Sequence, residues 1–95
     1  MNRLEHLLTI LTEECAEVQQ ATAKALRFGM HEGRDIEATN FDRLQAELND
    51  LFAVVEMVND EIEGQFHRDS TMLREKKEKV EKYLLYSAEC GTLNT

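Results

Sequence analysis

The fold is indicated first by residues 4–18, which read LEHLLTILTEECAEV. Apolar side chains recur in this stretch at intervals of three or four residues, and that spacing places them along one face of an α-helix. The apolar line continues beyond the stretch to Leu26, and Thr22 is the one polar residue on it. The pattern therefore predicts a long amphipathic helix with an apolar face formed by Leu4, Leu7, Leu8, Leu11, Cys15, Val18, Ala25 and Leu26.

Both ends of this helix are marked by residues that favour helix termini. Asn2 is a favourable N-cap, and Glu5 follows three residues later, where a capping box needs an acid. Gly29 is typical of the position just after a helix C-terminus. We therefore predict that the first helix runs from about Arg3 to Phe28.

A glycine-containing segment separates this helix from a second one. Residues 29–40 hold two glycines and scattered polar side chains, which predicts a loop with at most one helical turn. The second helix is expected from about Phe41 to about Glu63, with Thr39 or Asn40 as its N-cap. Its apolar face is formed by Leu44, Leu48, Leu51, Val55, Val58 and Ile62.

A third helix is expected after Asp69 and Ser70, and it should end before Gly91. Its apolar side chains are Met72, Leu73, Val80, Tyr83 and Leu84. Proline is absent from the chain, and no stretch sustains the alternation of apolar and polar residues that a half-buried strand shows. The predicted fold class is therefore all-α, a bundle with three main helices per chain.

The length of the chain limits how much apolar surface it can bury. At 95 residues and 11.0 kDa it has room for one domain, residues 1–95. A domain of this size buries only about 60–65% of its unfolded surface, so its own core contributes roughly a few kcal/mol. We therefore expect the bundle to be completed by association into a homodimer or homotetramer.

Charge and hydropathy argue against two classes of partner. The chain carries 19 acidic and 11 basic residues, a formal charge of −8 and a pI near 4.8, which is the wrong sign for binding DNA or RNA. The same charge disfavours an anionic membrane surface, and no apolar run approaches the roughly 20 residues that span a bilayer. We expect a soluble protein that binds neither nucleic acid nor membrane.

The two cysteines and the N-terminal residues bear on cellular location. Cys15 and Cys90 show no CxxC spacing and have too few nearby histidines for a zinc site, so reduced thiols are expected. The N-terminal stretch carries an acid and a histidine before any long apolar run, and no small-residue cleavage site follows it. The expected location is the cytoplasm.

Four acidic residues lie on or beside the apolar faces of the first two helices. With about 100° of rotation per residue, Glu14 falls at the edge of the first face and Glu47 inside the second. Because residues three apart on a helix face the same way, Glu17 lies beside Glu14 and Asp50 beside Glu47. Burying a lone carboxylate costs several kcal/mol unless a cation compensates for it. Both helices therefore place acids where they need a positive partner.

Antiparallel packing of the two helices would bring these carboxylates together. Oxygen-only clusters suit hard ions, and Mg²⁺ is held by carboxylates together with water and substrate phosphates. A di-iron bundle would need Glu-x-x-His pairs, whereas position 17 is Glu and position 50 is Asp. The residues therefore predict a Mg²⁺ site, with Mn²⁺ as a substitute, formed by Glu14, Glu17, Glu47 and Asp50.

A simpler interpretation stays open at this point. The acids could be rim charges that pair with basic side chains such as Lys24 or Arg43, or that are simply solvated. The protein would then be a non-catalytic helical dimer, for example an adaptor.

The two acidic motifs together resemble a known family. Glu13-Glu14-Cys15-Ala16-Glu17 and Glu47-Leu48-Asn49-Asp50, separated by residues 18–46, are similar to the EExxE…ExxD signature of the MazG-like all-α nucleoside triphosphate pyrophosphohydrolases. The resemblance spans about residues 7–63. It implies an obligate helical-bundle dimer or dimer of dimers, dependence on Mg²⁺, and cleavage between the α and β phosphates to give a nucleoside monophosphate and pyrophosphate. A degenerate member would instead be a nucleotide-binding regulatory protein.

Hydrolysis at that position needs a water molecule aligned behind the α phosphorus. Glu13 stands one residue before the first acidic pair and is turned further toward solvent, so it is a candidate to hold or deprotonate this water. The general base could equally be one of the metal ligands, and Glu14 is the second catalytic candidate. With a charge of −8 on the protein, the triphosphate should arrive as its magnesium complex.

Basic residues provide candidate phosphate contacts. Lys24 lies on the same flank of the first helix as Glu17 and could reach a phosphate, or it could be solvated or ion-paired. The third helix carries a run of basic residues interleaved with acids, which is typical of a solvated face. MazG-like proteins use basic residues downstream of ExxD for phosphate, so the resemblance makes Lys76 and Lys79 further candidates.

Overall fold

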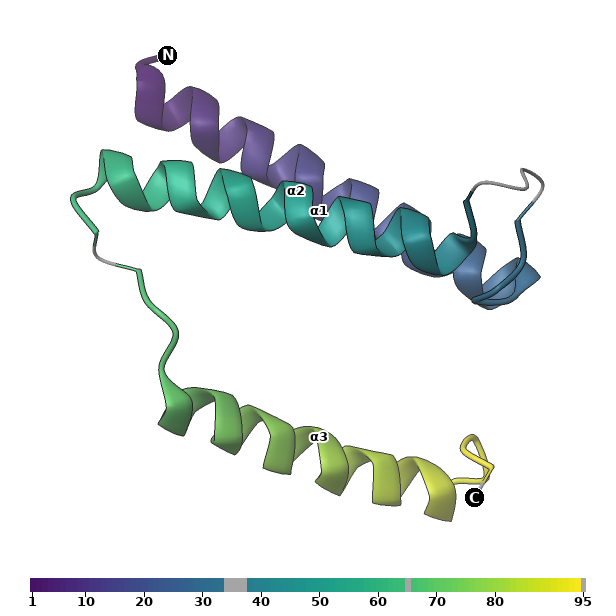
Figure 1. Cartoon of the computed structure of the whole chain (residues 1–95). Coiled ribbons are helices and arrows are strands. Elements are labelled where there is room, and N and C mark those ends of the chain that lie inside the picture. The colour runs from purple at the N-terminus through teal and green to yellow at the C-terminus, as the bar shows by residue number, and fades with distance from the viewer. Residues whose placement is uncertain (34–37, 65, 95) are drawn as a thin grey trace. The chain divides into compact units, whose positions relative to one another are not determined.

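The computed structural model describes residues 1–33, 38–64 and 66–94 (Figure 1). It contains three helices, α1 (Arg3–Phe28), α2 (Asn40–Glu61) and α3 (Ser70–Glu89), and no strand within the described ranges. The all-α prediction is confirmed. None of these helices combines the length and apolar character that crossing a membrane requires, within the part of the chain that the structure describes.

The chain divides into two compact units, Met1–Gln65 and Phe66–Thr95. The first unit holds α1 and α2, and the second holds α3. The single domain expected for residues 1–95 stays a prediction.

The capping residues predicted for α1 are in place. The Glu5 backbone N–H donates to the Asn2 side-chain oxygen at 2.8 Å, and the Asn2 N–H donates to the Glu5 carboxylate at 3.2 Å. At the other end, Gly29 has a φ of 102°, which only glycine adopts without strain, and its N–H closes the helix on the Ala25 carbonyl at 2.9 Å. The helix therefore has the predicted bounds.

The bounds of α2 differ slightly from the prediction. Thr39 is the N-cap, and it forms a reciprocal capping box with Asp42, so the helix begins at Asn40. It ends at Glu61, two residues earlier than expected, because Glu63 (φ 65°) and Gly64 (φ 73°) both adopt left-handed backbone conformations. Of the loop predicted for residues 29–40, residues 34–37 lie outside the described ranges.

The helices α1 and α2 pack antiparallel. Arg3 at the start of α1 forms an ion pair with Glu61 at the end of α2, with 3.1 Å between Nε and Oε2. At the opposite end, the Asn40 side chain donates to the Gly29 carbonyl at 2.8 Å. Both contacts require the two chain directions to oppose each other.

The buried apolar cluster between these two helices is small and lies toward the N-terminal end of α1. It consists of Leu7, Val54 and Val58, with Leu4 and Leu11 partly buried against it. This cluster fixes the register in which the remaining turns of α1 and α2 face each other.

The second unit contains a capped but solvated helix. Asp69 is the N-cap of α3 and accepts from the Met72 backbone N–H at 2.9 Å. Arg74 forms an ion pair with Glu78 one turn later, with 3.8 Å between Nε and Oε1. No residue of α3 is buried. The apolar side chains predicted for this helix are therefore exposed in the structure.

Candidate metal centre

Four carboxylates meet where the middles of α1 and α2 face each other. Glu14 and Glu17 project from α1, and Glu47 and Asp50 project from α2. One oxygen from each residue lies within 4.8 Å of one oxygen from every other. The structure therefore brings together the four residues that the sequence singled out as ligands.

Two members of this group hold a buried oxygen that has no partner. Glu14 and Glu47 are half-buried, whereas Glu17 and Asp50 are exposed. Oε2 of Glu14 and Oε2 of Glu47 are shielded from solvent and accept no hydrogen bond from any group within the described ranges. A buried carboxylate oxygen without a donor is unfavourable, so these two atoms fit a site that a cation completes.

Burial and crowding raise the pKa of the two half-buried acids. For Glu14, the main cause is burial, followed by repulsion from Glu17 and Asp50. For Glu47, the main cause is a hydrogen bond shared with Glu17, which requires that one of the two carboxyls be protonated, and burial comes second. Without a cation, Glu14 and Glu47 therefore hold a proton more tightly than isolated carboxyl groups do.

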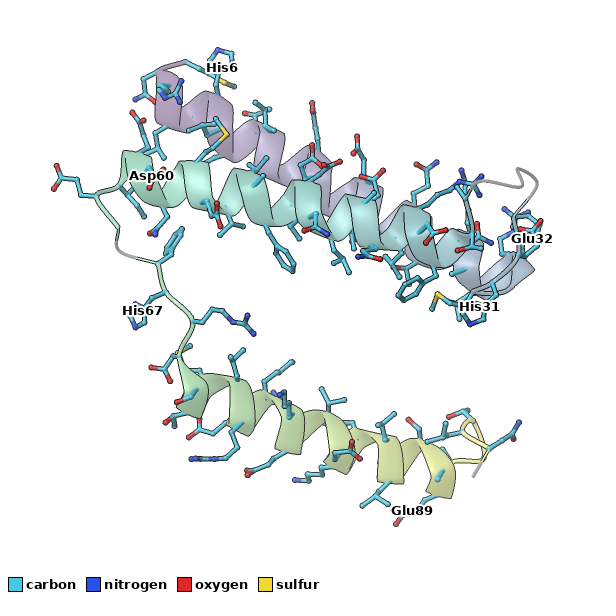
Figure 2. All side chains as sticks on the ribbon, in the orientation of Figure 1. His6, His31, Glu32, Asp60, His67 and Glu89 are labelled. Atoms are coloured by element: carbon cyan, nitrogen blue, oxygen red, sulfur yellow. The ribbon has the colours of Figure 1, made fainter. Side chains whose placement is uncertain are left out.

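The donor set favours a hard divalent cation. All four groups offer carboxylate oxygens, and no histidine or cysteine belongs to the cluster among the described residues. Figure 2 shows His6 near the start of α1 and His31 beyond the end of that helix. The residues present offer the all-oxygen ligand set of a hard divalent cation, without the histidine or cysteine ligands typical of zinc and di-iron sites.

The basic residues invoked by the simpler interpretation lie close to the cluster. Lys24 and Arg43 line an open pocket of about 180 Å³ beside it, and Glu17 and Glu47 form part of the same wall. Lys24 is exposed and forms no ion pair within the described ranges. The lysine therefore does not supply the missing partner of the buried carboxylate oxygens.

The structure also places the other predicted site residues. Glu13 is exposed and is not one of the four converging residues, although its charge contributes to the raised pKa of Glu14. Lys76 and Lys79 are exposed residues of α3, in the second unit. Their assignment as phosphate contacts stays a prediction.

Sequence reasoning did not assign a site role to Asn40 or Arg43, which lie at the start of α2. Asn40 is 3% exposed and accepts from the Arg43 guanidinium at 3.3 Å. A spacing signal was present, because Asn40, Arg43 and Glu47 follow one another at intervals of three and four residues and so share a face of the helix.

The chain matches no known family model, no curated protein and no solved structure.

Proposed function

We propose that the protein is a Mg²⁺-dependent nucleoside triphosphate pyrophosphohydrolase that releases a nucleoside monophosphate and pyrophosphate. The observation that carries this proposal is the convergence of Glu14, Glu17, Glu47 and Asp50, whose oxygens lie within 4.8 Å of one another. These are four of the five acids of the two motifs that resemble the MazG-like signature, and Glu13 is the fifth. The partnerless buried oxygens of Glu14 and Glu47 support it further.

The four carboxylates would hold the cation. When bound there, the cation neutralises negative charge on the phosphate oxygens around the scissile bond. The carboxylates of Glu17 and Asp50 are the exposed members of the group, so they face the side from which a nucleotide arrives.

The reaction itself requires a positioned water molecule. Its oxygen forms a bond to the α phosphorus, the bond from that phosphorus to the bridging oxygen breaks, and pyrophosphate leaves with the bridging oxygen. In this proposal the exposed Glu13 carboxylate holds the water and accepts its proton, with Glu14 as the other candidate base. Glu13 suits the task because it stands beside the cluster without belonging to it.

The proposal includes association into a homodimer or homotetramer. The buried cluster of the first unit contains only Leu7, Val54 and Val58 within the described ranges. Large apolar side chains of α2, such as Phe52 and Met57, are exposed in the single chain. Association of subunits would cover such surface and add the core that so short a chain lacks.

The product analysis that tests this function uses the full chain with a panel of ribo- and deoxyribonucleoside triphosphates and Mg²⁺. Anion-exchange separation should show a monophosphate and pyrophosphate in equal amounts, and none without the divalent cation. A diphosphate with orthophosphate would mean that another bond is cleaved. Binding without cleavage would favour a nucleotide-binding regulatory protein, and neither binding nor cleavage would favour an adaptor.

A further inference from the structure

The pocket beside the four carboxylates is built from both helices of the first unit. Glu17 and Lys24 line it from α1, and Arg43 and Glu47 line it from α2. Since Glu17 and Glu47 also belong to the acidic cluster, a molecule in the pocket lies directly beside the proposed cation. The pocket and the metal site are therefore parts of one surface.

Two positively charged side chains from different helices face this pocket. A guanidinium presents five N–H donors in a planar fork that matches phosphate oxygens, and a lysine ammonium binds them as a point charge. In a chain with a formal charge of −8, a pocket lined by both Lys24 and Arg43 stands out as a place for an anion. The acids on the same wall repel that anion until a divalent cation neutralises them.

The position of Arg43 is set by a buried side chain. Asn40 is 3% exposed, and its side-chain amide donates to the Gly29 carbonyl at 2.8 Å and to the Glu32 carboxylate at 3.1 Å. With both donors directed at the segment after α1, its oxygen accepts from Arg43 Nη1 at 3.3 Å. The guanidinium is thus held from the start of α2, and less conformational freedom is lost when an anion binds.

The size of the pocket narrows the choice of anion. Its volume is about 180 Å³, whereas sites that enclose drug-sized molecules occupy roughly 300–1,000 Å³. The pocket is therefore too small to enclose a base and a sugar together with a phosphate chain. A short phosphate chain bound next to a divalent cation fits both the volume and the charges.

We propose that Arg43 and Lys24 bind the β and γ phosphates of the nucleotide, which leave as pyrophosphate, and that Asn40 is the positioning residue for Arg43. This inference rests on the proposed function, because it assigns the leaving group of that reaction to the pocket.

Inorganic pyrophosphate is the probe for this pocket, titrated calorimetrically into the full chain with Mn²⁺ present. The wild type should bind it only with the metal. The Arg43→Gln substitution should weaken pyrophosphate binding about ten- to a hundredfold, the range expected when a hydrogen bond to a charged group is lost. Affinity for Mn²⁺ alone should not change. Arg27→Gln, one turn from Lys24 on α1 but outside the pocket, is the matched control and should bind pyrophosphate like the wild type.

A double-mutant cycle tests the role of Asn40. Asn40→Ala should weaken pyrophosphate binding in the wild-type background and have no further effect in the Arg43→Gln background, whereas a merely structural role would lower the melting temperature and affect binding equally in both. If Asn40→Ala does not fold, Arg43→Lys, which keeps the charge and loses the fork, should still bind pyrophosphate more weakly than the wild type.

Two outcomes separate this inference from the proposed function. A chain that hydrolyses triphosphates, and in which Arg43→Gln binds pyrophosphate as tightly as the wild type does, would overturn the pocket assignment and leave the function standing. A wild type that neither hydrolyses triphosphates nor binds pyrophosphate with Mn²⁺ would overturn both.

Discussion

The interface between α1 and α2 has an apolar stretch at one end and an acidic stretch further along, and the two affect the stability of the helix pair in opposite ways. Toward the start of α1, Leu7 packs against Val54 and Val58, and Arg3 pairs with Glu61 across the helix ends. About two to three turns further along α1, the interface holds the four carboxylates, and burial and neighbouring acids raise the pKa of two of them, Glu14 and Glu47. The first stretch holds the helices together, and the second works against that packing unless a cation is present.

The largest effect should follow from breaking the acidic stretch while leaving the apolar one intact. Asp50→Asn removes an exposed ligand charge and keeps the shape of the side chain, so the fold should survive. We expect kcat for triphosphate hydrolysis to fall by about three orders of magnitude, because ligands of one metal act as a unit. The matched control is Glu56→Gln, an exposed acid of α2 outside the cluster, which should retain wild-type turnover. Full activity in Asp50→Asn would remove the proposed mechanism.

The reverse experiment disrupts the apolar cluster of Leu7, Val54 and Val58 and leaves the acids unchanged. Leu7 is 4% exposed, and truncating it to alanine should lower the free energy of unfolding by about 2–5 kcal/mol, from lost burial and from the cavity left behind. Its neighbour Leu8 is 44% exposed, so Leu8→Ala should cost much less. Urea unfolding followed by circular dichroism at one fixed protein concentration measures both. Equal losses would show that the Leu7 cluster is not the main apolar contact.

A smaller effect should come from pH in the absence of metal. The folded-state pKa values of Glu14 and Glu47 lie above their ordinary value of 4.5, so the folded chain binds more protons than the unfolded one between 4.5 and the raised values. Stability should therefore increase as the pH falls from 7 toward 4.5, and decrease as it rises through the raised pKa values.

The substitution Glu47→Gln should weaken the dependence of stability on pH and raise the melting temperature measured without metal. The control Glu56→Gln should leave the pH dependence and the melting temperature unchanged. Asp42 does not interfere in this range. Hydrogen bonds from Thr39 lower its pKa, so its contribution to the stability of the protein is lost only as the pH falls below the ordinary value of 3.8. A wild type in EDTA that loses stability steadily from pH 7 to 4.5 would contradict the account of the cluster.

The fold could be predicted as far as local patterns determine it. The caps Asn2, Thr39 and Asp69 gave the helix starts to within a residue, because each satisfies backbone N–H groups that the helix leaves open. The apolar faces were less informative, since periodicity defines a face but not how much of it is covered. Leu8 and Leu26 lie on the predicted face, yet they are exposed in the single chain.

The same distinction holds for the site. The four carboxylates could be predicted because two pairs spaced three residues apart need only antiparallel helices to converge. The proposed role of Arg43 could not be predicted from its spacing alone, because that role depends on the contacts of Asn40 with Gly29 and Glu32, which the fold alone creates. Spacing shows which residues share a face, but not which side chain is held in place.

The most direct test of the central claim, that the acidic stretch is a cation site, is a calorimetric Mn²⁺ titration of the full chain with a non-hydrolysable triphosphate. The wild type should bind the metal, and Glu13→Gln should bind it with nearly the same affinity, because Glu13 stands outside the four converging residues. Glu47→Gln should lose most of that affinity. A wild type that binds no Mn²⁺, or a Glu47→Gln variant that binds it as tightly as the wild type, would contradict the account.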